Sequence, residues 1–239
     1  MHLTREPAIL YFGTPVVLIS TLNPDGSANL APMSSIFWLG WRCMIGLGGA
    51  SHTAANLLRT GECVLNLPSQ DQVAAVDRLA LTTGSDPVPG AKAQRGYRTV
   101  KDKFAHASLT ADASQTVGAP RVRECPVQLE AVLEGRHGMA EGDPLLHGRA
   151  IAFELRITRV HLAPGIVKAH QPDHVDPDQW RPLIMSFQKF YGLEPQQLHD
   201  SRLASIPEAM YRSPDVDRAR QRRSTRPLSP AAPSTPLPA

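Results

Sequence analysis

One stretch of the sequence gives the main indication of the fold and function of this chain: Gly46-Leu47-Gly48-Gly49-Ala50-Ser51-His52-Thr53-Ala54-Ala55-Asn56. An apolar run ends in the glycines, and the hydroxylated residues then open a predicted short helix over Thr53–Thr60. The first N–H groups of a helix lack partners and lie at its positive end, so they favour an anion. The stretch therefore indicates either a seat for a phosphate-bearing cofactor or, as the plainer alternative, a helix cap that follows a glycine turn.

The segment before this stretch predicts a β-hairpin. Val16–Thr21 is rich in β-branched residues, Asn23-Pro24-Asp25-Gly26 is a strong turn signal, and Ala28–Pro32 returns as a second strand. A tight turn joins antiparallel neighbours. The hairpin therefore disfavours a dinucleotide-binding βαβ unit, which also needs a glycine where this chain has Ser51.

The strand pattern continues through the chain and predicts the fold class. Cys63–Leu67 is a short apolar strand, and Val127–Glu134 and Ile151–Thr158 alternate apolar and polar residues. Apolar residues at helical spacing predict helices over Asp71–Leu81 and Asp178–Tyr191. We predict a mainly β protein with helical additions, built as a closed antiparallel β-barrel.

Composition restricts the function classes. The tail 213–239 has five Arg against two Asp, so the other residues balance at 20 basic and 20 acidic, which gives no argument for binding nucleic acid or a membrane. Three well-separated cysteines form no C-x-x-C pair and predict buried thiols in a reducing compartment. No apolar stretch approaches the ~18 residues of a membrane span, so we expect a cytoplasmic protein.

Two segments have the composition of regions that lie outside the packed core. Thr82–Tyr97 is rich in Gly, Pro and polar residues, which is typical of either a lid or a solvated insertion. Residues 213–239 combine arginines with six prolines, and we expect them to be disordered. The predicted organisation is one domain over residues 1–212 and a tail over 213–239.

Several short motifs in this order carry a resemblance to a known family. They are Thr14–Thr21, Asp25-Gly26, Asn29–Ser35, Ser51–Leu57, Glu62–Leu67, Asp102-Lys103-Phe104, Leu109-Thr110 and Glu124–Glu130. Together they resemble the flavin reductase-like family of FMN-binding split barrels, over about residues 8–212. The family pattern usually has glycine before the Leu-Thr pair, where this chain has Ser108.

The resemblance implies a homodimer that holds FMN near the subunit interface. The phosphate is expected at Ser51, His52, Thr53 and Asn56, and the flavin ring along Asn29–Ser35, with Asn29, Met33, Ser34 and Ser35 as contacts. Lys103 is a candidate for the phosphate or the ring edge, the alternative being a solvated lysine. His52 could donate to the phosphate or could be a neutral surface imidazole.

Other candidate residues are weaker. Phe37, Trp38 and Trp41 could form a wall of the flavin site or pack in the core. His170 and His174 lie four apart, but Pro172 between them breaks the helix that would place both on one face, so we expect no metal site. Hydride transfer to a flavin needs little acid–base chemistry, and we nominate no catalytic residue.

Two function classes remain open from the sequence. The first is an enzyme, an NADH- or NADPH-dependent flavin reductase that keeps FMN bound or delivers reduced flavin to a partner oxygenase. The second is a flavoredoxin-like FMN-binding electron-transfer protein that takes electrons from a protein partner. A more remote third is a split-barrel relative that oxidises or reduces a small molecule directly.

Overall fold

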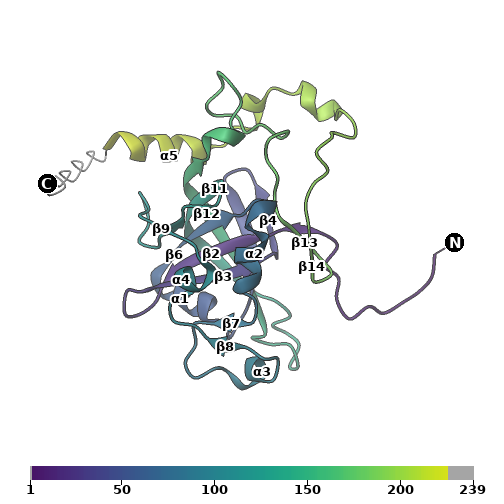
Figure 1. The fold of residues 1–239 in the computed structure, drawn as a ribbon, viewed down its shortest axis with the longest axis vertical. Coiled ribbons are helices and arrows are strands. Elements are labelled where there is room, and N and C mark those ends of the chain that lie inside the picture. The colour runs from purple at the N-terminus through teal and green to yellow at the C-terminus, as the bar shows by residue number, and fades with distance from the viewer. Residues whose placement is uncertain (1, 226–239) are drawn as a thin grey trace, which may run out of the picture.

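The computed structural model describes residues 2–225, and their side chains up to residue 221. A seven-stranded antiparallel sheet forms its centre, in the order β3-β2-β6-β11-β12-β5-β4 (Figure 1). The strands are β2 (Val17–Leu22), β3 (Ala28–Met33), β4 (Ile36–Leu39), β5 (Arg42–Gly48), β6 (Glu62–Leu67), β11 (Val127–Gly138) and β12 (Ala150–Leu162).

The predicted hairpin and the predicted short helix are both confirmed. β2 and β3 pair antiparallel, with Val17 opposite Met33 and Leu22 opposite Ala28. Helix α1 (His52–Thr60) follows β5, and Gly61 ends it in the left-handed conformation that suits glycine. The glycine-rich stretch therefore lies between a central strand and a helix, as the sequence indicates.

The predicted fold class, a mainly β split barrel with helical additions, is confirmed, but the barrel is not closed as the strand pattern alone predicts. The ends of the sheet, β3 and β4, do not pair with each other, so the seven strands form an open, split barrel. The hairpin β2–β3 instead has its two faces covered by different layers. Val17 and Ile19 face the main core with α1, while Leu18 and Leu30 face a second core beneath two other helices.

The second core is built by α2 (Val73–Arg78) and α4 (Lys103–Ala107). The helix predicted over Asp71–Leu81 is thus present but shorter, because a turn of 3-10 helix, η1 (Gln70–Gln72), precedes α2. Ser108 ends α4 with φ of +56°, a left-handed backbone that glycine adopts more readily. The departure from the family pattern therefore leaves this turn intact.

The helix predicted over Asp178–Tyr191 is wrong. This segment contains strands β13 (Ile184–Ser186) and β14 (Lys189–Tyr191), joined by a turn in which Phe187 and Gln188 have positive φ. Pro182 breaks helical hydrogen bonding, and β13 pairs with β1 (Thr14–Pro15) from the far end of the chain. The apolar residues are still used, since Leu183 is buried in the second core.

The expected disorder of 213–239 is wrong for the part that is described. Helix α5 (Pro214–Thr225) packs on β12, and the buried Asp215 carboxylate accepts a hydrogen bond of 3.1 Å from Arg42 Nε (Figure 1). Residues 226–239 lie outside the described residues. The tail thus begins as an attached helix.

The remaining elements are short and lie in the connections. Figure 1 shows β7, α3 and β8 together at the lower end of the molecule, in the segment predicted from its composition to lie outside the packed core. They are β7 (Thr82–Thr83), α3 (Gly90–Ala93), β8 (Arg98–Thr99), β9 (Ala111–Asp112), β10 (Arg121–Val122), η2 (Pro164–Ile166), η3 (Arg202–Ser205) and η4 (Glu208–Tyr211).

Candidate functional site

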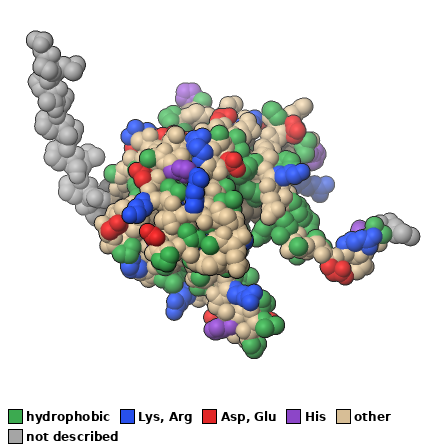
Figure 2. Space-filling model, turned by 60° about the horizontal axis from the view of Figure 1, so that its bottom comes forward, with side chains coloured by type: hydrophobic (Ala, Val, Ile, Leu, Met, Phe, Trp, Pro, Cys, Tyr) green, Lys and Arg blue, Asp and Glu red, His purple; other side chains and the backbone are tan. Residues whose placement is uncertain are grey.

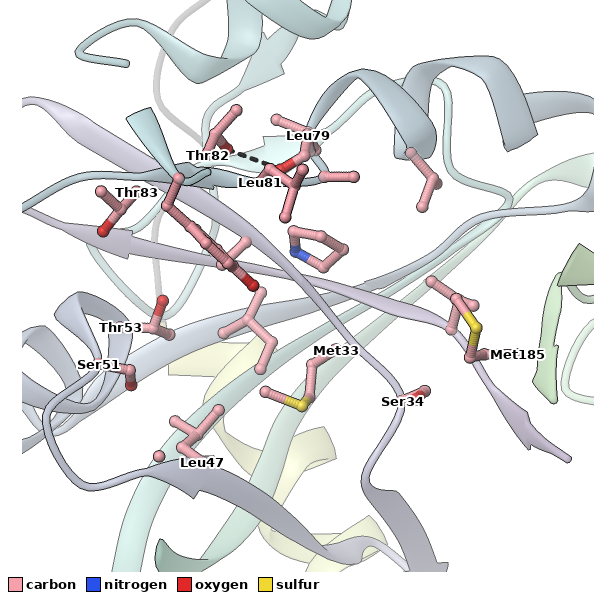
Figure 3. A pocket seen from close by; sticks show the side chains of 18 of the residues that line it. Met33, Ser34, Leu47, Ser51, Thr53, Leu79, Leu81, Thr82, Thr83 and Met185 are labelled. Atoms are coloured by element: carbon pink, nitrogen blue, oxygen red, sulfur yellow. Dashed lines mark hydrogen bonds between the residues drawn. The ribbon is translucent and has the colours of Figure 1, made fainter. Parts of the chain in front are cut away.

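A cavity of about 670 Å³ opens where the glycine-rich stretch, the end of β3 and the segment after α2 meet (Figure 3). One part of its wall is apolar, with Met33, Leu47, Leu79 and Met185. Polar groups come from Ser51 and Thr53 at the start of α1, which lie in Figure 3 beside Leu47 and on the side away from Met185. This combination of an apolar wall and a few polar groups is typical of a ligand site.

The start of α1 supplies unpaired donors. The Ser51 hydroxyl caps the helix by accepting a hydrogen bond of 3.1 Å from Ala54 N–H. The N–H groups of His52 and Thr53 have no hydrogen bond to any described residue. These donors and the positive end of the helix dipole make an anion seat, and Ser51 and Thr53 both line the cavity.

Gly49 is required for close backbone packing beside the start of α1. A Cβ on Gly49 would collide with the carbonyl oxygen of Gly148, because the β11–β12 connection packs directly on this turn. The N–H of Gly49 also donates to the Arg149 carbonyl at 3.0 Å. Gly49 is therefore needed for backbone packing beside the seat, whereas Gly48 lines the cavity itself.

Lys103 contributes a buried positive charge. It is 3% exposed, lines the cavity and forms no ion pair with a carboxylate in the described part of the chain. Burial, with a smaller effect from Lys92, lowers its pKa to about 8. Since an unpaired buried ammonium is unfavourable, an anion in the cavity would stabilise the protonated form. Lys103 is thus not the solvated lysine of the alternative reading.

His52 is held neutral beside the seat. Its Nε2 lies 2.7 Å from Asn23 Oδ1, which also accepts from Asn56 Nδ2 at 2.9 Å. Because an amide oxygen only accepts, Nε2 is the nitrogen that carries the proton in the neutral ring. Burial, followed by the charge of Lys103, lowers the pKa of His52. Its backbone N–H therefore suits an anion better than its ring does.

The two asparagines lie beneath the seat. Asn56 is buried and does not line the cavity, because its amide donates to Thr21 Oγ1 at 3.1 Å and to Asn23. Asn29 does not line it either, and its amide donates to Thr53 Oγ1 at 3.3 Å. We therefore assign both a supporting position instead of the direct contact expected from the sequence.

Ser34 and Ser35 lie where β3 ends. Both line the cavity, and no described residue hydrogen-bonds to either hydroxyl. The Ser35 carbonyl accepts from Gly46 N–H at 2.8 Å, which ties this turn to β5. The expected set of Met33, Ser34, Ser35, Ser51, His52, Thr53 and Lys103 is thus brought together around one cavity.

The aromatic residues expected as a possible wall do not line this cavity. Trp38 and Trp41 pack against the main core, and Phe37 is 55% exposed. Nor do the histidines of the metal reading form a site. His174 lies 3.4 Å from Glu208, and the described residues contain no group of three or more His, Cys, Asp or Glu that could hold a metal ion.

Sequence reasoning missed two parts of the wall. The segment after α2 brings Lys92, Arg95 and Tyr97 to the cavity, and the β13–β14 hairpin brings Gln188 and Phe190. Lys92, Arg95 and Tyr97 lie in a segment whose sequence has no helical or strand periodicity. The only feature that could have indicated a binding role is the pair of basic residues three positions apart. The second part, the β13–β14 hairpin, was read as a helix, which would place its side chains differently.

Residues 9–194 match the family described as flavin reductase like domain, and the chain belongs to that family. This family and the antiparallel split barrel support a flavin-binding oxidoreductase. No helix among residues 2–225 combines the length and apolar character needed to cross a bilayer.

Individual relatives agree with this family. The chain is 36% identical over 188 residues to the uncharacterized protein YdfE of Bacillus subtilis (strain 168), covering 79% of this chain and 87% of that protein. Its fold is similar to that of flavoredoxin of Desulfovibrio vulgaris (Miyazaki F), with TM-score 0.67, 18% identity and coverage of 86% and 99%. It is also similar to nitrilotriacetate monooxygenase component B from Bacillus cereus, with TM-score 0.63, 19% identity and coverage of 80% and 88%.

Proposed function

We propose that this protein binds FMN in the cavity and reduces it with NADH or NADPH. The observation that carries the proposal is the pairing of Lys103, a buried cation without a carboxylate partner, with the free N–H groups that begin α1. A phosphate monoester matches both features, because it brings negative charge and several acceptor oxygens.

The rest of the cavity fits a flavin. Its volume of about 670 Å³ suits a cofactor of this size, and its apolar wall could lie against the flavin ring. The free hydroxyls of Ser34 and Ser35 could donate to the polar edge of the ring. A bound FMN would supply the redox chemistry, as the acceptor for the hydride and a solvent proton by which the nicotinamide would be oxidised and the flavin reduced.

The protein's own part in this reaction is to bind and orient. His52 is neutral and hydrogen-bonded to Asn23, so it is not placed as an acid. Lys103 and His52 line the same cavity, and the charge of Lys103 helps to lower the pKa of His52, so we assign Lys103 to the phosphate instead of the ring edge. We assign no catalytic acid or base.

The proposal includes a homodimer. Residues before β1 extend from the body as an arm, and Figure 2 shows hydrophobic side chains gathered where an arm joins the body. Exposed apolar residues on this arm, on the β13–β14 hairpin and in the segment between β14 and α5 include Leu10, Tyr11, Phe12, Phe187, Tyr191, Leu193, Leu198 and Tyr211. A second copy of the chain would cover this apolar surface. Tyr11 belongs to the surface and also lines the cavity, so the proposed subunit interface would lie beside the flavin site.

The proposal also includes a partner oxygenase and a reducing cellular compartment. The fold is similar to that of nitrilotriacetate monooxygenase component B, which supports an oxygenase as the acceptor of reduced flavin. Cys43, Cys63 and Cys125 are buried free thiols, which supports a reducing compartment such as the cytoplasm.

An absorbance experiment tests this function. The protein is purified, supplied with FMN, freed of unbound flavin and mixed with NADH or NADPH without oxygen. We expect flavin absorbance to bleach with at least one nicotinamide. A bound flavin that neither nicotinamide reduces would overturn the reductase and indicate the electron carrier, and a protein that retains no FMN under any condition would overturn both.

A further inference from the structure

Two cations stand around one aromatic ring at the mouth of the cavity. Lys92 belongs to α3 and Arg95 follows it, so both reach the ring of Tyr97. Lys92 Nζ lies 5.4 Å and Arg95 Cζ 5.6 Å from the ring centroid. At these distances the ring holds both cations through its electron-rich face, without neutralising their charge.

Neither cation has an acidic partner. Lys92 Nζ lies 3.4 Å from Thr83 Oγ1, and Arg95 Nε donates to the Ala91 carbonyl at 3.0 Å. In the part of the chain that the structure describes, no carboxylate forms an ion pair with either one, and Asp77 is the only acidic residue of the cavity wall. The mouth of the cavity therefore carries a positive charge that no acidic residue of the mouth neutralises among the described residues.

The mouth is distinct from the seat at α1. Burial and then Lys92 lower the pKa of Lys103, while burial and then Arg95 lower the pKa of Lys92. Lys103 is 3% exposed, Lys92 is half-buried and Arg95 is exposed. These exposures place Lys103 inside the cavity, Lys92 between, and Arg95 at the mouth.

We propose that Lys92 and Arg95, held by Tyr97, form a second anion-binding site that takes the 2′-phosphate of NADPH and gives the protein a preference for NADPH over NADH. The inference rests on the proposed function. If the nicotinamide reaches into the cavity, the adenosine end must leave through its mouth. The 2′-phosphate is the group that separates the two nicotinamide cofactors, and basic side chains recognise it.

A binding measurement without turnover tests this site. Adenosine 2′,5′-bisphosphate and adenosine 5′-monophosphate differ by the 2′-phosphate alone, and each is titrated by calorimetry into the FMN-saturated protein. We expect the bisphosphate to bind roughly tenfold more tightly or better, as for a hydrogen bond to a charged group. Equal affinities would overturn the second site, while FMN retention and reduction by NADH would leave the proposed function standing.

Variants assign the effect to the named residues. Arg95→Gln and Lys92→Gln should each remove most of the preference for the bisphosphate. Arg136→Gln is the matched control, because Arg136 is exposed on β11 and does not line the cavity. Tyr97→Leu should weaken the preference and Tyr97→Phe should keep it, since only the first removes the aromatic face. A preference unchanged in Arg95→Gln, or lost equally in Arg136→Gln, would contradict the assignment.

The same titrations on flavin-free protein separate the two proposals. If the protein binds no FMN, a bisphosphate preference that Arg95→Gln abolishes still supports the mouth site. A preference that survives Arg95→Gln but is lost in Thr53→Ala would place the bisphosphate at α1 and overturn the mouth site.

Discussion

Gly84 packs directly against His52: a Cβ built on Gly84 would lie 2.5 Å from His52 Cδ2 and 2.8 Å from Asn29 Oδ1. Real Cβ atoms do not approach so closely, so any larger residue must move one of the two segments. The segment after α2 therefore rests on the start of α1, and the phosphate seat and the cavity mouth share a contact.

Gly84→Ala should weaken FMN binding, because the added methyl pushes His52 or the β7 segment out of place. We expect a loss of affinity of about tenfold with little change in the melting temperature, measured by flavin titration and thermal unfolding. Gly90→Ala is the control, since a Cβ there meets nothing within 4 Å. Equal effects in the two variants would contradict the role of this contact.

Lys103→Met should change stability and binding in opposite directions. Removing an unpaired buried charge should stabilise the flavin-free protein, while the loss of that charge should weaken FMN affinity at least tenfold. The measurements are urea unfolding without flavin and FMN titration. A variant that loses stability but keeps its affinity would show that Lys103 has a structural role only.

The pH dependence of the flavin-free protein should report the same residue. The pKa of Lys103 is lowered to about 8 from 10.5, so between these values the unfolded chain binds more protons than the folded one. Its contribution to stability should therefore rise as pH increases from about 8 to 10.5. The difference in unfolding free energy between wild type and Lys103→Met isolates the contribution of Lys103 from that of other titrating groups. A difference that stays constant from about pH 8 to 10.5 would contradict the lowered pKa.

Thr53→Ala should weaken FMN binding by about a hydrogen bond to a charged group, ~1.5–3 kcal/mol. Thr60→Ala, at the other end of α1, removes a hydroxyl that donates to the Asn56 carbonyl and should leave affinity unchanged. Flavin titration of both variants compares them directly. Wild-type affinity in Thr53→Ala would place the phosphate elsewhere.

Much of the fold could be predicted because its signals are local. The turn at Asn23–Gly26 forces an antiparallel pair, and Ser51 begins α1 as its cap. The same locality explains the two main errors. β13 pairs with β1 across most of the chain, and α5 is fixed by Asp215, which lies 173 positions from Arg42. No periodicity within either segment encodes such partners.

The residues of the candidate site also fall into those that local sequence motifs predict and those that they do not. Ser51, Thr53 and Lys103 belong to motifs whose chemistry can be read from the sequence, and they line the cavity. Asn56 belongs to such a motif too, but its side chain turns to Thr21 and Asn23. Lys92, Arg95 and Tyr97 come from an irregular segment, whose position depends on the packing of Gly84 on His52.

The attached part of the tail gives a further prediction. Deleting residues 213–239 should lower stability by about 1–3 kcal/mol, since it leaves Arg42 without Asp215 and uncovers part of β12. Deleting only residues 226–239 is the control and should leave unfolding unchanged. Neither deletion should abolish flavin binding, because none of the described side chains of α5 lines the cavity. Equal stability of the two truncated proteins would show that α5 contributes nothing.

The central claim is that a flavin phosphate binds at the start of α1 beside Lys103. Titrating the purified protein with FMN and with riboflavin, which lacks only the phosphate, tests this claim most directly. We expect FMN to bind at least about 100-fold more tightly, because the helix start and Lys103 both act on the phosphate. Equal affinity for the two flavins, or no affinity for either, would contradict it.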